Sequence, residues 1–246
     1  MKRMLAVLAV VSALAACGQG PTTATSPGTP TVYATAQEGS VLLAIDPVTG
    51  SARSLGPLNA GGAFALAVRN DGVFFTVTSS GFTPNPDARL ATVDPSTGGV
   101  TVFGKPFGTY LRMMGLAFAP DGTLYGSSPI TNSLYRLDLV TGLPELVGAF
   151  GVNGVMDLAT GPDGELYANT TSALYRVDPR SGTATLAARV SGARMLMGIA
   201  FGGNQLYATT YEADSGIYRV DLGTGAATLV ARTGQAFVHS AELVGR

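Results

Sequence analysis

The stretch Leu174-Tyr175-Arg176-Val177-Asp178-Pro179-Arg180-Ser181-Gly182 decides the fold, because versions of it recur along the chain. Its four relatives are Val41 to Gly50 (VLLAIDPVTG), Arg89 to Gly98 (RLATVDPSTG), Leu134 to Gly142 (LYRLDLVTG) and Ile217 to Gly225 (IYRVDLGTG). The five aspartates, Asp46, Asp94, Asp138, Asp178 and Asp221, follow one another at intervals of 48, 44, 40 and 43 residues. A period in the forties, rich in β-branched and aromatic residues, predicts a β structure built blade by blade.

Each repeat divides into four short strand candidates. In the repeat that contains Leu134 these are residues 114–119, 123–127, 133–138 and 143–147. A Pro-Asp-Gly type of turn separates the first two strands, and the Asp-x-x-Thr/Ser-Gly turn separates the last two. Proline fixes φ, aspartate accepts a bond from the backbone two residues on, and glycine takes the left-handed position. We interpret both motifs as structural turns, because a calcium loop would need alternating acids that these turns lack.

Four-stranded units repeated five times, with the landmarks PDGxLY and LYRxDPxTG, resemble the bacterial β-propeller superfamily that includes NHL, YVTN and gluconolactonase-like proteins. The resemblance implies an all-β, five-bladed propeller of antiparallel blades over residues 31–246. The last repeat supplies only a first strand, around residues 237–243, while strands two, three and four are found at the front, as residues 31–36, 41–46 and 52–55. Joining them closes the ring and removes its exposed edges.

The N-terminus has the features of an export signal. A basic start and a short apolar run over residues 1–16 are typical of a secretory signal that is removed. Leu14-Ala15-Ala16-Cys17 resembles the lipobox of bacterial lipoproteins, which implies lipidation of Cys17 and a membrane anchor. The alternative is a plain signal peptide with an accidental cysteine. Residues 17–30 contain only small, polar, Gly and Pro residues beyond Cys17, so we expect a flexible tether.

This reading places the protein outside the cytoplasm, anchored by lipid in the cell envelope, at an outer membrane or at the cell surface. Cys17 is the only cysteine, so an internal disulfide and a cysteine-based zinc site are excluded. Removal of Lys2 and Arg3 with the signal leaves 13 of the 15 basic residues against 16 acidic ones. With no basic block either, nucleic acid is not an expected partner.

The meander also predicts which surface is free to bind. Turns between strands one and two and between strands three and four share one face, and the chain enters the ring on that face. The loops between strands two and three and the connections between blades share the opposite face, which would point away from the membrane. Irregular loops on a rigid scaffold are where binding sites usually lie.

One axial position departs from the repeat. The first strand of each blade lines the axis, where five blades leave little room, and its aligned residues are Ala65, Gly115, Asp157 and Gly198. Asp157 is either a ligand for something at the channel mouth or a solvated acid bonded to a backbone group. The preceding position holds Phe64, Met114, Met156 and Met197, which we interpret as core packing rather than as a binding site.

Four further residues are binding candidates. His239 falls in the equivalent region of the last blade, near Ser240 and Glu242, although the alignment there slips by a residue. A single histidine cannot build a multi-histidine metal site, and its neighbour Ser240 is no evidence of a catalytic triad. Arg112 and Arg194 enter corresponding strands from the loop side, and together with Tyr110 they could contact an anion or a peptide. Solvent-facing arginines are the alternative.

Three classes of function remain. The favoured one is a binding or scaffolding module whose partner is a protein or an envelope polymer. The second is a small-molecule or glycan binder at the channel mouth, although the chain has no tryptophan for sugar stacking. The third, implied by the resemblance, is a metal-dependent hydrolase or lactonase, but the axial positions offer only Asp157 and perhaps Glu242. We therefore predict no catalytic residue, no metal site and no cofactor, and the enzyme question stays open.

Overall fold

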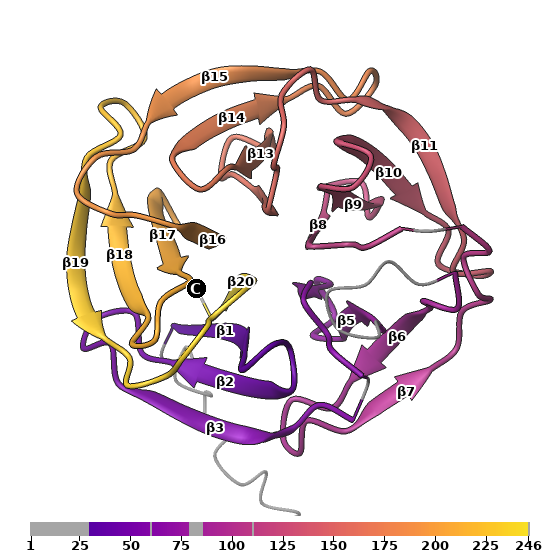
Figure 1. Cartoon of the computed structure of the whole chain (residues 1–246), viewed down its shortest axis with the longest axis horizontal. Helices are drawn as coiled ribbons and strands as arrows, with labels where there is room; N and C mark the ends of the chain where they lie inside the picture. Colours follow the sequence, from indigo (N-terminus) through magenta and orange to yellow (C-terminus); the bar gives the residue numbers. More distant parts are fainter. Residues whose placement is uncertain (1–29, 60, 79–85, 110, 246) are drawn as a thin grey trace, which may run out of the picture.

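The computed structural model describes residues 30–59, 61–78, 86–109 and 111–245. These residues form twenty β-strands in five four-stranded antiparallel sheets, and they contain no helix. The sheets stand side by side in a closed ring around a central axis (Figure 1). The predicted five-bladed β-propeller is confirmed.

Each blade is numbered here from its innermost strand outward. Blade one contains β4 (Ala67–Val68), β5 (Phe74–Val77), β6 (Leu90–Val93) and β7 (Val100–Val102). Blade two contains β8 (Gly115–Phe118), β9 (Leu124–Ser128), β10 (Ser133–Leu137) and β11 (Pro144–Ala149). Blade three contains β12 (Asp157–Thr160), β13 (Leu166–Asn169), β14 (Ala173–Val177) and β15 (Ala184–Arg189). Blade four contains β16 (Leu196–Gly202), β17 (Gln205–Thr210), β18 (Gly216–Val220) and β19 (Ala227–Arg232).

Blade five joins the two ends of the chain, as the sequence predicts. Its strands are β20 (Ala241–Val244), β1 (Thr31–Ala36), β2 (Val41–Ile45) and β3 (Ala52–Pro57), in that order from the axis outward. Thr31 lies opposite Val244, and Ala34 lies opposite Ala241. The innermost strand begins later than the expected residue 237, because Phe237 has a φ of 54°, which is incompatible with an extended strand.

The repeated aspartates hold the outer turns. In the turn of blade five, Asp46 Oδ1 accepts the backbone N–H groups of Val48 at 2.7 Å and Thr49 at 3.0 Å. These backbone hydrogen bonds lower the pKa of Asp46. In the equivalent turn of blade three, Gly182 has a φ of 79°, a conformation that only glycine adopts freely. The repeat motif therefore encodes a turn, as predicted.

The hydrophobic core is divided among the blade interfaces. Five clusters of buried apolar side chains each combine residues of two neighbouring blades. Between blades two and three, for example, Leu134 packs in the same cluster as Leu158 and Val177. Hydroxyl groups add hydrogen bonds between blades: Thr209 Oγ1 of blade four donates to the His239 carbonyl at 2.9 Å.

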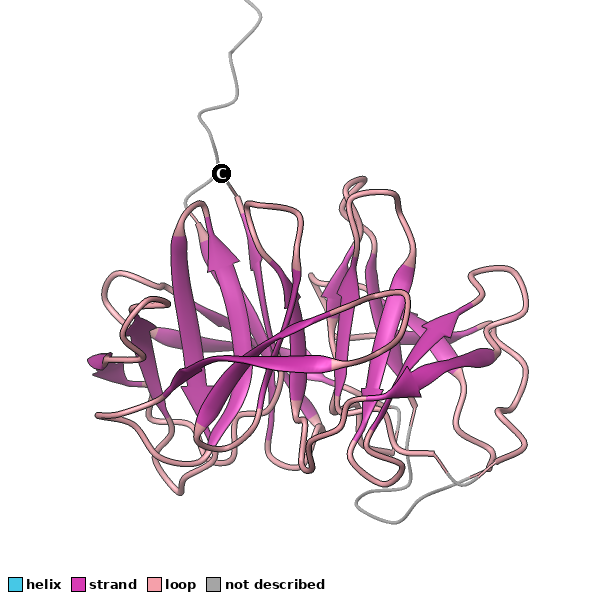
Figure 2. Cartoon of the chain, turned by 90° about the horizontal axis from the view of Figure 1, so that it is seen from above, coloured by secondary structure: helices cyan, strands magenta, loops and turns pink. Residues whose placement is uncertain are grey.

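The two faces of the ring differ in what they carry (Figure 2). Thr31 begins the second strand of blade five, so the described chain enters on the face that carries the turns between strands one and two. We call this the turn face. The opposite face, the loop face, carries the loops between strands two and three and the connections between blades. Within the described residues, no helix is long and apolar enough to cross a membrane.

Candidate functional site

His239 completes a ring of five residues at the loop-face end of the central channel. The N–H groups of Met114 and Met156 bond to the carbonyls of Ser127 and Asn169 in the second strands of their blades, at 3.0 and 2.8 Å. The N–H of His239 makes the same bond to Thr35, at 2.8 Å. This settles the alignment in the last blade. The five members of the mouth ring are Phe64, Met114, Met156, Met197 and His239.

The mouth ring closes the channel with packed side chains. Phe64, Met114 and Met197 form a buried cluster, against which Met156 and Tyr211 pack as partly buried residues. The imidazole of His239 lies edge-on to Phe64, with ring centroids 4.7 Å apart, and 5.1 Å from the ring of Tyr211. The loop-face end of the axis is thus filled by apolar and aromatic groups from all five blades.

His239 is an uncharged imidazole at neutral pH. Only 1% of its surface is exposed, and this burial is the main reason that its pKa falls to about 4. The positive charge of Arg112 lowers the pKa further. Burial also lowers the pKa of Arg112 itself. The structure therefore brings together two of the residues that the sequence singled out, Arg112 and His239.

A buried neutral imidazole predicts acid sensitivity. The unfolded chain binds a proton at His239 near pH 6.5, whereas the folded protein binds it only near pH 4. Stability at this residue is therefore lost as the pH falls from about 6.5 to about 4, by about 3 kcal/mol in total. We expect His239→Met, which carries the residue of three other mouth-ring positions, to lose this part of the pH dependence.

The measurement is urea unfolding of both proteins at pH 7 and at pH 4.5. The difference between wild type and variant removes the contributions of other titrating groups. A difference in stability that stays constant between the two pH values would contradict the prediction.

Asp157 lies one residue deeper in the channel than the mouth ring. It is fully buried, and its Oδ2 accepts the backbone N–H groups of Ile199 in β16 and Ala241 in β20, each at 3.1 Å. Burial raises its pKa well above the usual range, and the backbone hydrogen bonds oppose that rise. Of the two alternatives, the bond to backbone groups is present, but the carboxyl group is not solvated. It ties blade three to blades four and five.

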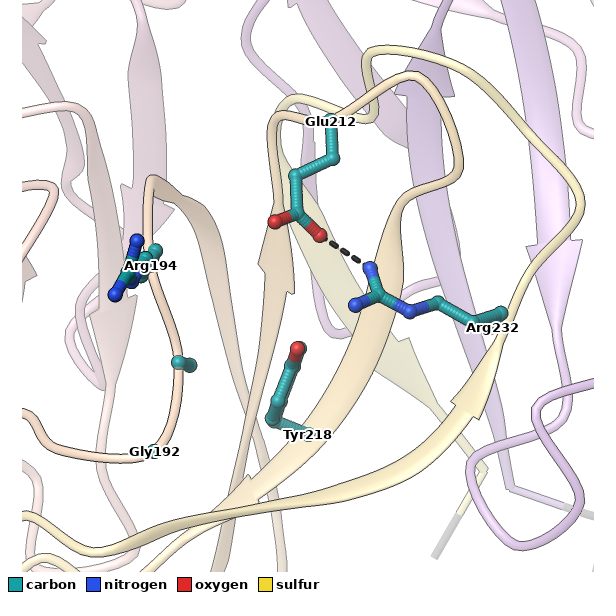
Figure 3. A pocket seen from close by; sticks show the side chains of 6 residues that line it. Gly192, Arg194, Glu212, Tyr218 and Arg232 are labelled. Carbon is teal, nitrogen blue, oxygen red and sulfur yellow. Dashed lines mark hydrogen bonds and ion pairs between the residues drawn. The ribbon is translucent and has the colours of Figure 1, made fainter.

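Arg194 lies apart from the mouth ring, in a shallow pocket on the loop face (Figure 3). The pocket encloses about 370 Å³ and is lined by Gly192, Ala193, Arg194, Glu212, Tyr218 and Arg232. Arg232 forms a salt bridge with Glu212 and also donates to the carbonyl of Asp214 at 2.8 Å. Arg194 is exposed and lies across the pocket from this pair. An anionic group entering the pocket would meet the guanidinium of Arg194.

The loop between β17 and β18 connects the pocket to the mouth ring. It places Tyr211 against the ring and Glu212 in the pocket. The hydroxyl of Tyr211 donates to Glu38 Oε1 at 2.9 Å, which joins this loop to blade five. Sequence reasoning missed Glu212, Tyr218 and Arg232. The one available signal was the pair of acids, Glu212 and Asp214, in a loop of otherwise small residues.

Two of the sequence candidates fall outside the described residues. Cys17 precedes residue 30, and Tyr110 separates two described segments. Among the residues that are described, no three His, Cys, Asp or Glu side chains are grouped so that they could hold a metal ion. The loop face thus offers charged and aromatic groups suited to binding.

Comparisons with known proteins agree with the fold. A chain of the crystal structure of a nidogen/laminin complex is similar, with a TM-score of 0.56 and 11% sequence identity, over 87% of this chain and 98% of that chain. A chain of Kuenenia stuttgartiensis hydrazine synthase has a TM-score of 0.46 and 19% identity, over 71% of this chain and 49% of that chain. No curated protein matches the sequence. The family model described as "Repeat of unknown function (DUF6923)" matches residues 70–236, and the chain therefore belongs to the DUF6923 family.

Proposed function

We propose that this protein is a lipid-anchored extracytoplasmic binding or scaffolding module that holds a protein or envelope polymer on its loop face. One observation carries the proposal: the described chain enters the ring on the turn face, while the mouth ring and the Arg194 pocket lie on the opposite face. An anchor at Cys17 would leave the loop face directed away from the membrane. The loop face would then be free to meet a partner.

The scaffold supports this role. Five separate interface clusters hold the blades, so the loops are presented by a rigid body. Arg194 is exposed and accessible for an ionic contact. The similar chain in the nidogen/laminin complex comes from an assembly of two proteins, although at 11% identity the likeness extends only to the fold.

A second candidate function has one observation in its favour. The Arg194 pocket could bind a small anion, because the arginine faces a volume of about 370 Å³. The pocket is shallow, however, and small-molecule sites usually bury most of their ligand. A surface contact with a macromolecule fits this shape better.

The anchor is tested by labelling cells with a radioactive fatty acid. We expect label in the wild-type protein and none in Cys17→Ser, because the thiol is the group that the lipobox resemblance assigns to lipidation. The released Cys17→Ser protein should also leave the membrane fraction. Equal labelling of the two proteins would refute the anchor and leave the propeller as an unanchored module.

The binding face is tested by crosslinking on the same cells. A photoreactive amino acid at Arg194 on the loop face is compared with one at Val140 on the turn face, which is 89% exposed. We expect a discrete crosslinked product from the Arg194 position and none from the Val140 position. The same product from both positions, or from Val140 alone, would contradict binding through the loop face.

A further inference from the structure

The central channel contains a second acidic group besides Asp157. Glu242 belongs to β20, the innermost strand of blade five. As a residue it is partly exposed, but its carboxyl group lies in the interior, because burial is the main cause that raises its pKa well above the usual range. The negative charge of Asp157 raises the pKa further. The two carboxyl groups therefore interact across the channel.

Two buried oxygen atoms in this region lack a hydrogen-bond partner among the described residues. They are Asp157 Oδ1 and Ser127 Oγ, and both residues are 0% exposed. Ser127 lies opposite Gly115, and a Cβ on Gly115 would meet Asp157 Cα at 2.5 Å. Side chains directly opposite each other share one face of a sheet, so Ser127 faces β12.

The other blades show that Ser127 is exceptional. At the equivalent position, Thr209 donates to the His239 carbonyl at 2.9 Å and Thr35 donates to the Phe64 carbonyl at 3.4 Å. Each of these hydroxyls thus reaches the next blade. Ser127 makes no such bond within the described residues. Buried polar atoms are nearly always satisfied by protein, water or an ion, so a third group is expected here.

The balance of charge indicates what that group is. None of the salt bridges among the described residues includes Asp157 or Glu242. Buried carboxylates require neutralisation, by a proton or by a cation. Two backbone N–H groups point at Asp157 Oδ2 and favour the ionised form of this carboxyl group. An ionised Asp157 calls for a cation.

We propose that the channel binds one hard divalent cation between Asp157 Oδ1 and the carboxylate of Glu242, with the Ser127 hydroxyl as a neutral ligand. Ca²⁺ fits best, because it accepts carboxylate, carbonyl and water oxygens in irregular geometry, whereas Mg²⁺ demands a near-ideal octahedron. The bound ion ties blade three to blade five. With only two carboxylates we expect weak affinity, in the range of about 0.1 to 1 mM that is typical of extracellular modules.

The purified protein is first treated with EDTA and then titrated with CaCl₂ in a thermal-melting experiment, in parallel with equilibrium dialysis against ⁴⁵Ca²⁺. We expect one bound ion per chain and a saturable rise of the melting temperature. At one hundred times the dissociation constant, the folding equilibrium shifts about a hundredfold. For a domain of this size, that corresponds to a rise on the order of 5 °C.

Three variants and a control test the ligands. Asp157→Asn and Glu242→Gln preserve shape, and each should abolish the response to Ca²⁺. Ser127→Ala keeps both charges and should weaken binding severalfold, which guards against a charge variant that fails to fold. The control is Glu145→Gln on the outer strand β11, which should respond like the wild type. No bound ⁴⁵Ca²⁺ and no change in melting temperature would overturn the proposal and leave the two carboxyl groups neutralised by protons. A full response in Asp157→Asn would also overturn it.

Discussion

Deleting residues 32–37 should abolish stable folding. This segment supplies nearly all of β1, which lies between β20 and β2 and bonds to both. Without it, blade five loses the strand that joins the two ends of the chain, and the edges of β20 and β2 are exposed. The deletion also removes Val32, Ala34 and Ala36, all fully buried in the interface with blade four. The loss exceeds the 5 to 15 kcal/mol by which domains are normally stable.

Circular dichroism and thermal melting of the soluble protein measure this effect. We expect a broad, non-cooperative transition for the deletion and a sharp one for a control that begins at residue 30 and retains β1. A second control replaces residues 32–37 with a Gly/Ser segment of equal length, and it should fail like the deletion. Melting of the deletion variant at the wild-type temperature would show that the ring does not need this closure.

The fold was accessible from sequence because its determinants are local and repeated. The aspartate and glycine of each outer turn recur at a nearly constant interval, and each pair acts within a few residues of chain. The strand bounds of blade two agree with the expected ones to within two residues. Even the joining of the two termini could be predicted, since a count of strands reveals which ones the last blade lacks.

The strand that starts at Ala241 shows where local reasoning fails. The apolar pattern of residues 237–243 indicates a strand, but Phe237 adopts a left-handed backbone conformation. Its N–H donates to the carbonyl of Glu212, in the neighbouring blade, at 2.8 Å. That tertiary contact fixes the backbone of Phe237, and the amino-acid sequence around it carries no sign of this partner.

The site was accessible only in part. Asp157 is visible in an alignment of repeats, because it replaces a glycine or an alanine. Its hydrogen-bond donors are not visible, since Ile199 and Ala241 lie 42 and 84 residues away. Likewise Glu212 and Arg232 are paired across blade four and form a pocket that no motif announces. Contacts between blades depend on how the ring closes, and an alignment of repeats does not describe that geometry.

Gly198→Ala should be strongly destabilising, because the axis has no room for one methyl group. A Cβ at Gly198 would lie 2.3 Å from the carbonyl oxygen of His239 and 2.6 Å from the nitrogen of Ala241. Both atoms belong to the backbone of the neighbouring blade, so they yield only if the blades separate. Separation would also stretch the bonds from Asp157 to β16 and β20. Overpacking of a core costs about 1 to 3 kcal/mol, and we expect about 3 kcal/mol here.

Gly223→Ala is the matched control, since its Cβ would meet only Asp221 Oδ1, at 3.4 Å, in an exposed turn. Its stability should lie within about 0.5 kcal/mol of the wild type. Urea unfolding of both variants gives the free energies of unfolding. If Gly198→Ala unfolds at the wild-type midpoint, the inner strands are not in close contact and the axis can admit larger residues. If it is destabilised as expected, the small axial residues are a steric requirement of five blades, and Asp157 fits at the axis only because Gly198 leaves space beside it.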